Sequence, residues 1–376
     1  MSNPVAIAGV GLHPFGRFDR TVTQMGVTAV REALSAAGNP SFQAAFCATV
    51  YSGVAAGHKV LGALGLTGIP IVNIEAGCAS GGAALMLATN AVRSGQHDTV
   101  LVFGIEKMPR GIIRSSFFEP WREQAGLAAT PAYFALRATR LLRDSGITKE
   151  DLARVVVKNR AEGVNNEIAM YRTPTTVEDV LASRLVCEPL HLHMLCSPNE
   201  GAAAIVVQRA DLAPRGSVKI AAAQLRSHLP GSVLGESTPL SGGPDENIPA
   251  ASTIAALAAF EEAGCGPDDL DLVECQDTDA AREILAYEEL GLCARGDSAR
   301  LVRDGITARG GKLPVNLSGG LLSKGEPLGA SALAQVVELN NQIAGRSGIR
   351  QIDNAQVGMA HTVGRGANAA VVIVTK

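Results

Sequence analysis

The sequence has few aromatic residues, no long apolar run and no excess of charge of either sign. Only 4% of its 376 residues are aromatic, and no uninterrupted apolar stretch approaches the roughly 20 residues that cross a bilayer. The first residues, Met1–Gly11, lack the basic and apolar regions of a signal peptide. A formal net charge of −3 with interspersed signs offers no electrostatic footprint for nucleic acid or an anionic membrane. We therefore expect a soluble, cytoplasmic protein that binds neither nucleic acid nor membrane.

Several familiar site motifs are also missing. The seven cysteines form an odd, scattered set, which argues against a disulfide framework and for a reducing compartment. His191, His193 and Cys196 are metal-like ligands, but no second cluster at zinc spacing accompanies them, so we predict no metal site. Gly9-Val10-Gly11 is followed by Pro14 where a dinucleotide-binding loop requires glycine. The absence of G-x-S-x-G disfavours a serine hydrolase of the α/β type.

What the sequence does contain favours an α/β fold in two parts. Its 47% hydrophobic content and 41 glycines suit helices packed closely on sheets. Six of the fourteen aromatic residues fall in a segment of weak periodicity, which we interpret as an inserted loop domain at about 107–189. We predict an N-terminal half at 1–212 that contains this insertion and a C-terminal half at 216–376. The strands are expected at Val5–Val10, Ala48–Val54, Ile69–Ile74, Thr99–Gly104, Ala202–Gln208, Val218–Gln224 and Leu270–Glu274, and helices at Thr23–Ala37, Ala79–Ser94 and Ala251–Gly264.

The two halves repeat one another in outline. Val72–Gly82 and Val315–Gly325 both read as a strand, a tight turn and a helix of small residues. Weak self-similarity across a chain of this size implies duplication. Two packed α/β halves would bring the corresponding strand-to-helix turns near a shared pseudo-dyad, where such folds bind ligands.

Cys78 stands in the first of these turns. Its sulfur is expected near unpaired backbone N–H groups and the positive end of a helix macrodipole, an environment that lowers a thiol pKa. A thiolate there would attack a thioester, and the N–H groups would hold the developing oxyanion. The alternative is that Cys78 is a small buried residue, as most free cysteines are.

Three segments resemble the signature blocks of thiolases, in order and spacing. They are GCASGGAAL, VNLSGGLLSKGEPLGAS and AHTVGRGANAAVVIV, and ILAYEELGLC and LCSPNEGAAAIVV are similar to further landmarks of the family. The resemblance is strongest to the sterol-carrier-protein type and to bacterial lipid-transfer thiolases. It implies a five-layered αβαβα fold of two similar halves with a loop domain, a homodimer, and coenzyme A thioesters as substrates with no tightly bound cofactor.

The resemblance also assigns roles to single residues. Cys78 matches the nucleophilic cysteine that becomes acylated. His361 matches the histidine of the C-terminal block and is expected to be a hydrogen-bonding or acid/base partner. Gly364 and Gly366 match the turn whose backbone N–H helps to bind an oxyanion, and Asn316 is expected to be a supporting group.

Two positions depart from the family pattern. Glu326 replaces the histidine of the Gly-His-Pro motif, and an ionised carboxylate accepts a proton but donates no hydrogen bond. Gln276, Asp277 and Thr278 stand in the His-Asp-Cys block, where the cysteine is the acid/base for carbon–carbon bond formation. Since Thr278 has no accessible pKa, a Claisen step loses a proton shuttle worth roughly two to four orders of magnitude in rate, unless a nearby carboxylate replaces it.

Three functions stay open at this point. The first is an acyltransferase that uses acyl-CoA through an acyl-cysteine, with an acceptor that the sequence does not identify. The second is a non-catalytic or weakly catalytic acyl-CoA-binding subunit, acting with a small OB-fold partner as some relatives do. The third is retro-aldol or thiolytic cleavage of a branched or sterol side-chain acyl-CoA, against which the retained Cys78 argues. The residues that hold coenzyme A are not assigned.

Overall fold

The computed structural model describes residues 3–111, 113, 120–126, 129–229, 248–364 and 368–376. The strands are β1 (Val5–Gly16), β2 (Ala44–Ala48), β3 (Ile71–Ile74), β4 (Thr99–Lys107), β5 (Leu185–Cys187), β6 (Leu190–His191), β7 (Glu200–Arg209), β8 (Lys219–Ser227), β9 (Leu272–Cys275), β10 (Val357–Gly364) and β11 (Asn368–Thr375). The helices are α1 (Val22–Ala36), α2 (Ala56–Leu64), α3 (Ser80–Arg93), α4 (Pro120–Gln124), α5 (Thr130–Ser145), α6 (Lys149–Val164), α7 (Val177–Ala182), α8 (Ala251–Ala263), α9 (Ala280–Glu289), α10 (Ser298–Arg303), α11 (Gly320–Lys324) and α12 (Leu328–Ile343).

The strands form a mixed sheet whose two ends repeat one pattern. Its order is β3-β2-β4-β7-β1-β8-β11-β10-β9. β1 and β8 meet through one register pair, Ala6 with Lys219, and a hydrogen bond from Ile7 N to Val218 O. On the outer side of β9, Val315 forms a parallel bridge with Val273, just as β3 pairs in parallel with β2. The order 1-7-4-2-3 in one half therefore recurs as 8-11-10-9 and Val315 in the other, which confirms the predicted repeat.

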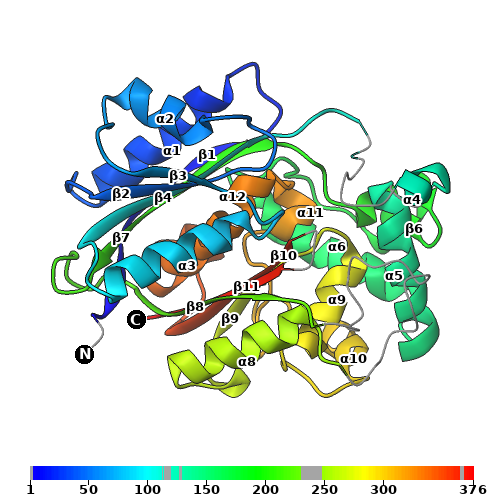
Figure 1. The fold of residues 1–376 in the computed structure, drawn as a ribbon. Helices are drawn as coiled ribbons and strands as arrows, with labels where there is room; N and C mark the ends of the chain where they lie inside the picture. The colour runs from blue at the N-terminus through cyan, green and yellow to red at the C-terminus, as the bar shows by residue number, and fades with distance from the viewer. Residues whose placement is uncertain (1–2, 112, 114–119, 127–128, 230–247, 365–367) are drawn as a thin grey trace.

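Helices cover the sheet in layers. α1 and α2 pack on the outer face of the N-terminal strands, and α8 and α9 on the outer face of the C-terminal strands. α3 and α12 lie between the two sets of strands and share one apolar core with both (Figure 1). A Cβ added at Gly81 or Gly82 would press on α12 or β11, so the small residues of α3 permit this close central packing. The molecule thus has the expected five layers.

The segment from α4 to β6 projects to one side of these layers (Figure 1). The sequence predicts a loop domain there, but the structure shows substantial helices, with α5 and α6 each 16 residues long. Their apolar faces share a core with α9 and with Leu322 of α11. Thr148 and Asp151 form a capping box at the start of α6, a local signal that marks this helix.

One predicted strand is displaced. The sequence suggests a strand at 48–54, whereas β2 ends at Ala48. The chain leaves the sheet there because the buried carboxylate of Glu106 accepts the N–H groups of Val50 and Tyr51 at 2.8 and 3.0 Å. The turn that contains Val50 and Tyr51 becomes part of the cleft described below. Within the described ranges, no helix combines the length and apolar character needed to cross a membrane.

Candidate active site

A cleft of about 970 Å³ opens between the layered core and the helical insertion. It is lined by the turn before α3, by α5 and α6 of the insertion, and by the segments that precede β7, α9 and α12. Cys78, Cys196, Gln276, Thr278 and Glu326 all contribute to its wall. Most of the polar residues that the sequence singles out therefore meet in one place.

Cys78 lies in the turn between β3 and α3, two residues before the first residue of the helix. The turn depends on Gly77, whose φ of +60° favours glycine. Ser80 fixes the turn because its Oγ donates to Gly77 O at 2.5 Å and accepts from Ala76 N at 2.8 Å. The partly buried sulfur thus stands near the positive end of a 14-residue helix.

Glu326 directly follows Val315–Gly325, the segment of the second half that repeats the Cys78 turn. Its side chain is almost buried, and Oε1 accepts from Gln276 Nε2 at 3.0 Å. Its backbone N donates to Ser197 O at 2.9 Å, which ties the residue to the segment before β7. Gly325, with φ +83°, lies so close to Asn199 that a side chain there would overlap it. The carboxylate is therefore held in place on two sides.

Cys196 is a second thiol in the cleft, and the sequence reasoning missed its role. Its Sγ lies 3.5 Å from Glu326 Oε2, and its backbone N donates to Thr278 O at 2.9 Å. Burial raises the pKa of this thiol well above its usual range, and Glu326, Asp277 and the nearby Cys78 act in the same direction. Cys196 consequently stays protonated and donates its S–H to Glu326. The available signal is the segment LCSPNEGAAAIVV, which resembles a landmark of the thiolase family but gives Cys196 no role by itself.

The Gln276–Thr278 block alternates between the cleft and the interior. Gln276 bridges Glu326 and the backbone N of Val363, which donates to its Oε1 at 2.9 Å. Thr278 lines the cleft, with its Oγ1 3.5 Å from an Arg137 nitrogen, and Arg137 also forms an ion pair with Asp279. These contacts hold the Thr278 hydroxyl in place, but a hydroxyl of this kind does not ionise in the range that acid/base catalysis needs.

Asp277 and Asn316 do not reach the cleft. Asp277 is fully buried and accepts from Leu321 N and Leu322 N at 2.6 and 3.1 Å, so it caps α11. Burial raises its pKa well above the usual range. Asn316, also buried, accepts from Cys275 N and donates to Glu283. Both residues support the turn beneath the site, and neither is placed to contact a substrate.

His361 is a third sequence-predicted residue that does not line the cleft. It lies within β10, fully buried, and its Nε2 is 3.0 Å from Ser252 Oγ of α8. Burial, reinforced by Arg282, lowers its pKa to about 3 although Glu289 opposes the shift. The ring is therefore neutral and faces the outer helix layer, so the geometry gives no support to its expected role as a partner of Cys78. The family resemblance identifies the strand on which His361 lies, but not the face of the sheet to which its side chain points.

The C-terminal glycine turn is only partly described. Gly364 ends β10 and lies against Ala76, close enough that a side chain there would overlap the Ala76 carbonyl. The described end of β10 thus lies beside the turn that contains Cys78. Gly366 lies outside the described residues.

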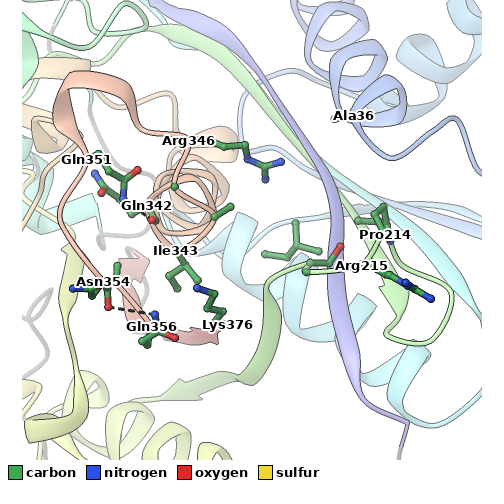
Figure 2. A pocket seen from close by; sticks show the side chains of 17 residues that line it. Ala36, Pro214, Arg215, Gln342, Ile343, Arg346, Gln351, Asn354, Gln356 and Lys376 are labelled. Carbon is green, nitrogen blue, oxygen red and sulfur yellow. Dashed lines mark hydrogen bonds between the residues drawn. The ribbon is translucent and has the colours of Figure 1, made fainter.

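A second pocket, of about 490 Å³, lies at the other end of α12 (Figure 2). Its described lining includes the cations Arg215, Arg346 and Lys376 and contains no cysteine, histidine, aspartate or glutamate. Leu328 at the start of α12 borders the first cleft, and a helix of this length spans about 24 Å. The second pocket is therefore remote from Cys78, and its described lining offers no thiol.

Sequence models of one family match both halves of the chain. Residues 5–179 match the thiolase N-terminal domain, and residues 240–376 match the thiolase C-terminal domain-like family. The acetyl-CoA acetyltransferase of Methanothermobacter thermautotrophicus is 35% identical over 99% of each chain. The chain belongs to the thiolase family. Sterol carrier protein 2 of Bos taurus is 33% identical to this thiolase over 99% of the chain and 72% of that protein, which confirms the predicted branch.

Solved structures confirm the fold. An Ltp2-ChsH2(DUF35) aldolase chain superposes with a TM-score of 0.85 at 23% identity, covering 99% of this thiolase and 98% of that chain. Identity at this level supports the architecture and not the activity. The thiolase fold, with two similar halves and a side domain, is thus established for this chain.

Proposed function

We propose that this thiolase transfers acyl groups from coenzyme A thioesters through an acyl-Cys78 intermediate. The observation that carries the proposal is the meeting of Cys78 with the Glu326–Cys196 pair in one cleft. A nucleophilic sulfur at a helix N-terminus and a fixed carboxylate are the two components that acyl transfer needs.

In the loading step, Glu326 accepts the proton of the Cys78 thiol. The Cys78 sulfur then forms a bond with the thioester carbonyl carbon, and the bond from that carbon to the coenzyme A sulfur breaks. Protonated Glu326 returns the proton to the departing thiolate, which leaves as free coenzyme A. Gln276 and Cys196 hold the carboxylate throughout, because each donates to one of its oxygens.

In the transfer step, ionised Glu326 accepts the proton of the acceptor, which attacks the acyl-Cys78 carbonyl; the bond from that carbon to the Cys78 sulfur breaks, and Glu326 returns the proton to the released thiolate. A thiol or hydroxyl acceptor can pass its proton to this carboxylate as it attacks. A carbon acceptor is a much weaker acid and needs a further base, which Thr278 cannot supply. We therefore propose transfer to a thiol or hydroxyl acceptor rather than a Claisen condensation.

The test measures both the mass of the acylated protein and the exchange of labelled coenzyme A. The protein is incubated with a panel of acyl-CoAs, and its intact mass is recorded beside the transfer of labelled coenzyme A into the unlabelled thioester. We expect a single acyl adduct and label exchange in the wild type, and neither in Cys78→Ala. Cys187→Ala, which removes a partly buried thiol outside the cleft lining, is the matched control and should behave as wild type. The absence of adduct and exchange across the panel would refute the proposal.

A second candidate is an acyl-CoA-binding subunit without turnover. Thr278 and the replacement of histidine by Glu326 favour it, because both remove groups on which thiolases rely. The solved chain of similar fold comes from an aldolase that also contains ChsH2(DUF35), and a small OB-fold partner and a homodimer remain predictions here. Calorimetric binding of an acyl-CoA without an adduct would favour the subunit, and light scattering of the purified chain would report its oligomeric state.

A further inference from the structure

Arg160 is a buried cation that faces the cleft. It lies on α6 with 9% of its surface exposed and contributes to the cleft lining. Its guanidinium carbon sits 4.1 Å from the centre of the Tyr171 ring, so the ring supports one face of the group. Its Nε is buried and has no hydrogen-bond partner.

No carboxylate in the described part of the chain pairs with Arg160. Other arginines of this region do have such partners: Arg137 pairs with Asp279, Arg303 with Asp151 and Arg309 with Glu162. An arginine stays charged in proteins, and an unpaired buried charge is costly. Burial lowers the pKa of Arg160, in keeping with this cost. The structure therefore retains a largely buried cation in the cleft whose Nε has no hydrogen-bond partner among the described residues.

The surroundings place Arg160 at the catalytic end of the cleft. The preceding residue, Asn159, donates to Asp277 at 2.8 Å beneath the Gln276–Thr278 block. Tyr171 N donates to Ser323 O at 2.9 Å, three residues before Glu326. Arg160 also lies near His193, whose pKa is lowered chiefly by burial and then by this arginine.

We propose that Arg160 binds a carboxylate carried by the acyl group, so that the preferred substrates are coenzyme A monothioesters of dicarboxylic acids. This inference rests on the proposed acyl-CoA function and specifies its substrate. A planar guanidinium offers parallel N–H donors that match a carboxylate, and Tyr171 holds the plane in place. A phosphate of coenzyme A is also an anion, but Tyr171, which stacks on Arg160, is hydrogen-bonded to Ser323 near Glu326, where the reacting acyl group must lie.

The experiment uses pairs of substrates that differ only in charge. Succinyl-CoA and its neutral isostere 4-methylpentanoyl-CoA form one pair, and glutaryl-CoA and 5-methylhexanoyl-CoA the other. For each, the affinity is measured by calorimetry in Cys78→Ala and the Cys78 acylation rate by mass spectrometry in the intact site. Loss of a charge-assisted hydrogen bond predicts that Arg160→Met weakens the response to an acidic substrate by roughly 10- to 150-fold. The neutral partner and free coenzyme A should change by less than threefold.

Two controls separate binding from stability. Arg154→Met removes an exposed arginine from the same helix and should alter neither preference. Arg160→Met should not lower the unfolding temperature, because an apolar side chain of similar size replaces an uncompensated charge. Arg160→Lys keeps the charge without the planar fork and should restore only part of the preference.

The outcomes are distinct. Equal responses to the acidic and neutral members of both pairs in the wild-type site would overturn the inference, as would equal losses for both members in Arg160→Met. A loss of free coenzyme A affinity in Arg160→Met would assign the arginine to a phosphate instead. If no substrate acylates Cys78, the acyltransfer proposal fails, while the affinities still decide whether Arg160 selects a carboxylate.

Discussion

Replacing Glu326 by glutamine isolates the proton-accepting role of this side chain. The two side chains have the same shape. The amide oxygen of the variant still accepts from Gln276 Nε2, which lies 3.0 Å from Oε1 of the native Glu326. On the other side, the amide NH₂ meets the protonated Cys196 thiol in place of the present 3.5 Å contact. The substitution thus removes one weak hydrogen bond and the base, while the position of the side chain is retained.

Base catalysis by a positioned side chain contributes roughly 10²–10⁴ in rate, or about 3–5 kcal/mol of barrier. We expect Glu326→Gln to slow Cys78 acylation by that factor, with acyl-CoA affinity changed by less than threefold. Quenched-flow mass spectrometry with a saturating acyl-CoA gives the acylation rate, and calorimetry gives the affinity. An acylation rate within threefold of wild type would refute Glu326 as the base. Unfolding in urea should differ by no more than about 1.5 kcal/mol, the value of a single hydrogen bond.

Three further outcomes follow from buried groups. Cys196→Ala should leave the acyl adduct in place and slow its formation by about tenfold or less, because one weak donor to the carboxylate is lost; complete loss of the adduct would instead make Cys196 essential. In the native protein the buried carboxylate of Glu274 lies 3.7 Å from the Lys324 ammonium. Lys324→Met leaves that carboxylate without its cation and should lower the free energy of unfolding in urea by about 3–5 kcal/mol. Adding Glu274→Gln should recover part of this loss, and no recovery would argue against their coupling. The pKa of His361 is about 3 in the folded chain, below the unfolded value of about 6.5, so the unfolded state binds the extra proton between these values and stability falls as pH drops below 6.5. Between pH 6.5 and 5 this amounts to about 1.6 kcal/mol, which His361→Gln should abolish in parallel urea titrations; an unchanged pH dependence would show that the ring does not stay neutral.

The turn at Cys78 could be predicted because its determinants are local. A glycine before the cysteine and small residues after it specify a tight turn and a closely packed helix, and the structure shows both. The matching turn before Glu326 followed from the internal repeat. The sequence and the family resemblance together therefore identify Cys78 and Glu326, the two residues on which the proposed chemistry depends.

Contacts between distant segments could not be predicted in the same way. Cys196 and Glu326 are 130 positions apart in sequence, and they meet because Pro198 forms a parallel bridge with Glu326. His361 lies on a strand that is buried on both faces, so the apolar pattern does not reveal which face meets the cleft. Arg160 lies on a helix whose charged residues mask its buried face, and only the tertiary packing shows that it lacks a partner.

Peptide mapping of the acylated protein tests most directly whether one sulfur carries the acyl group. After brief incubation with an acyl-CoA and proteolysis at acidic pH, tandem mass spectrometry locates the added mass. We predict that the acyl group resides on the peptide that contains Cys78 and that the peptide with Cys196 is unmodified. An adduct on Cys196 alone, or on several cysteines without preference, would contradict the account.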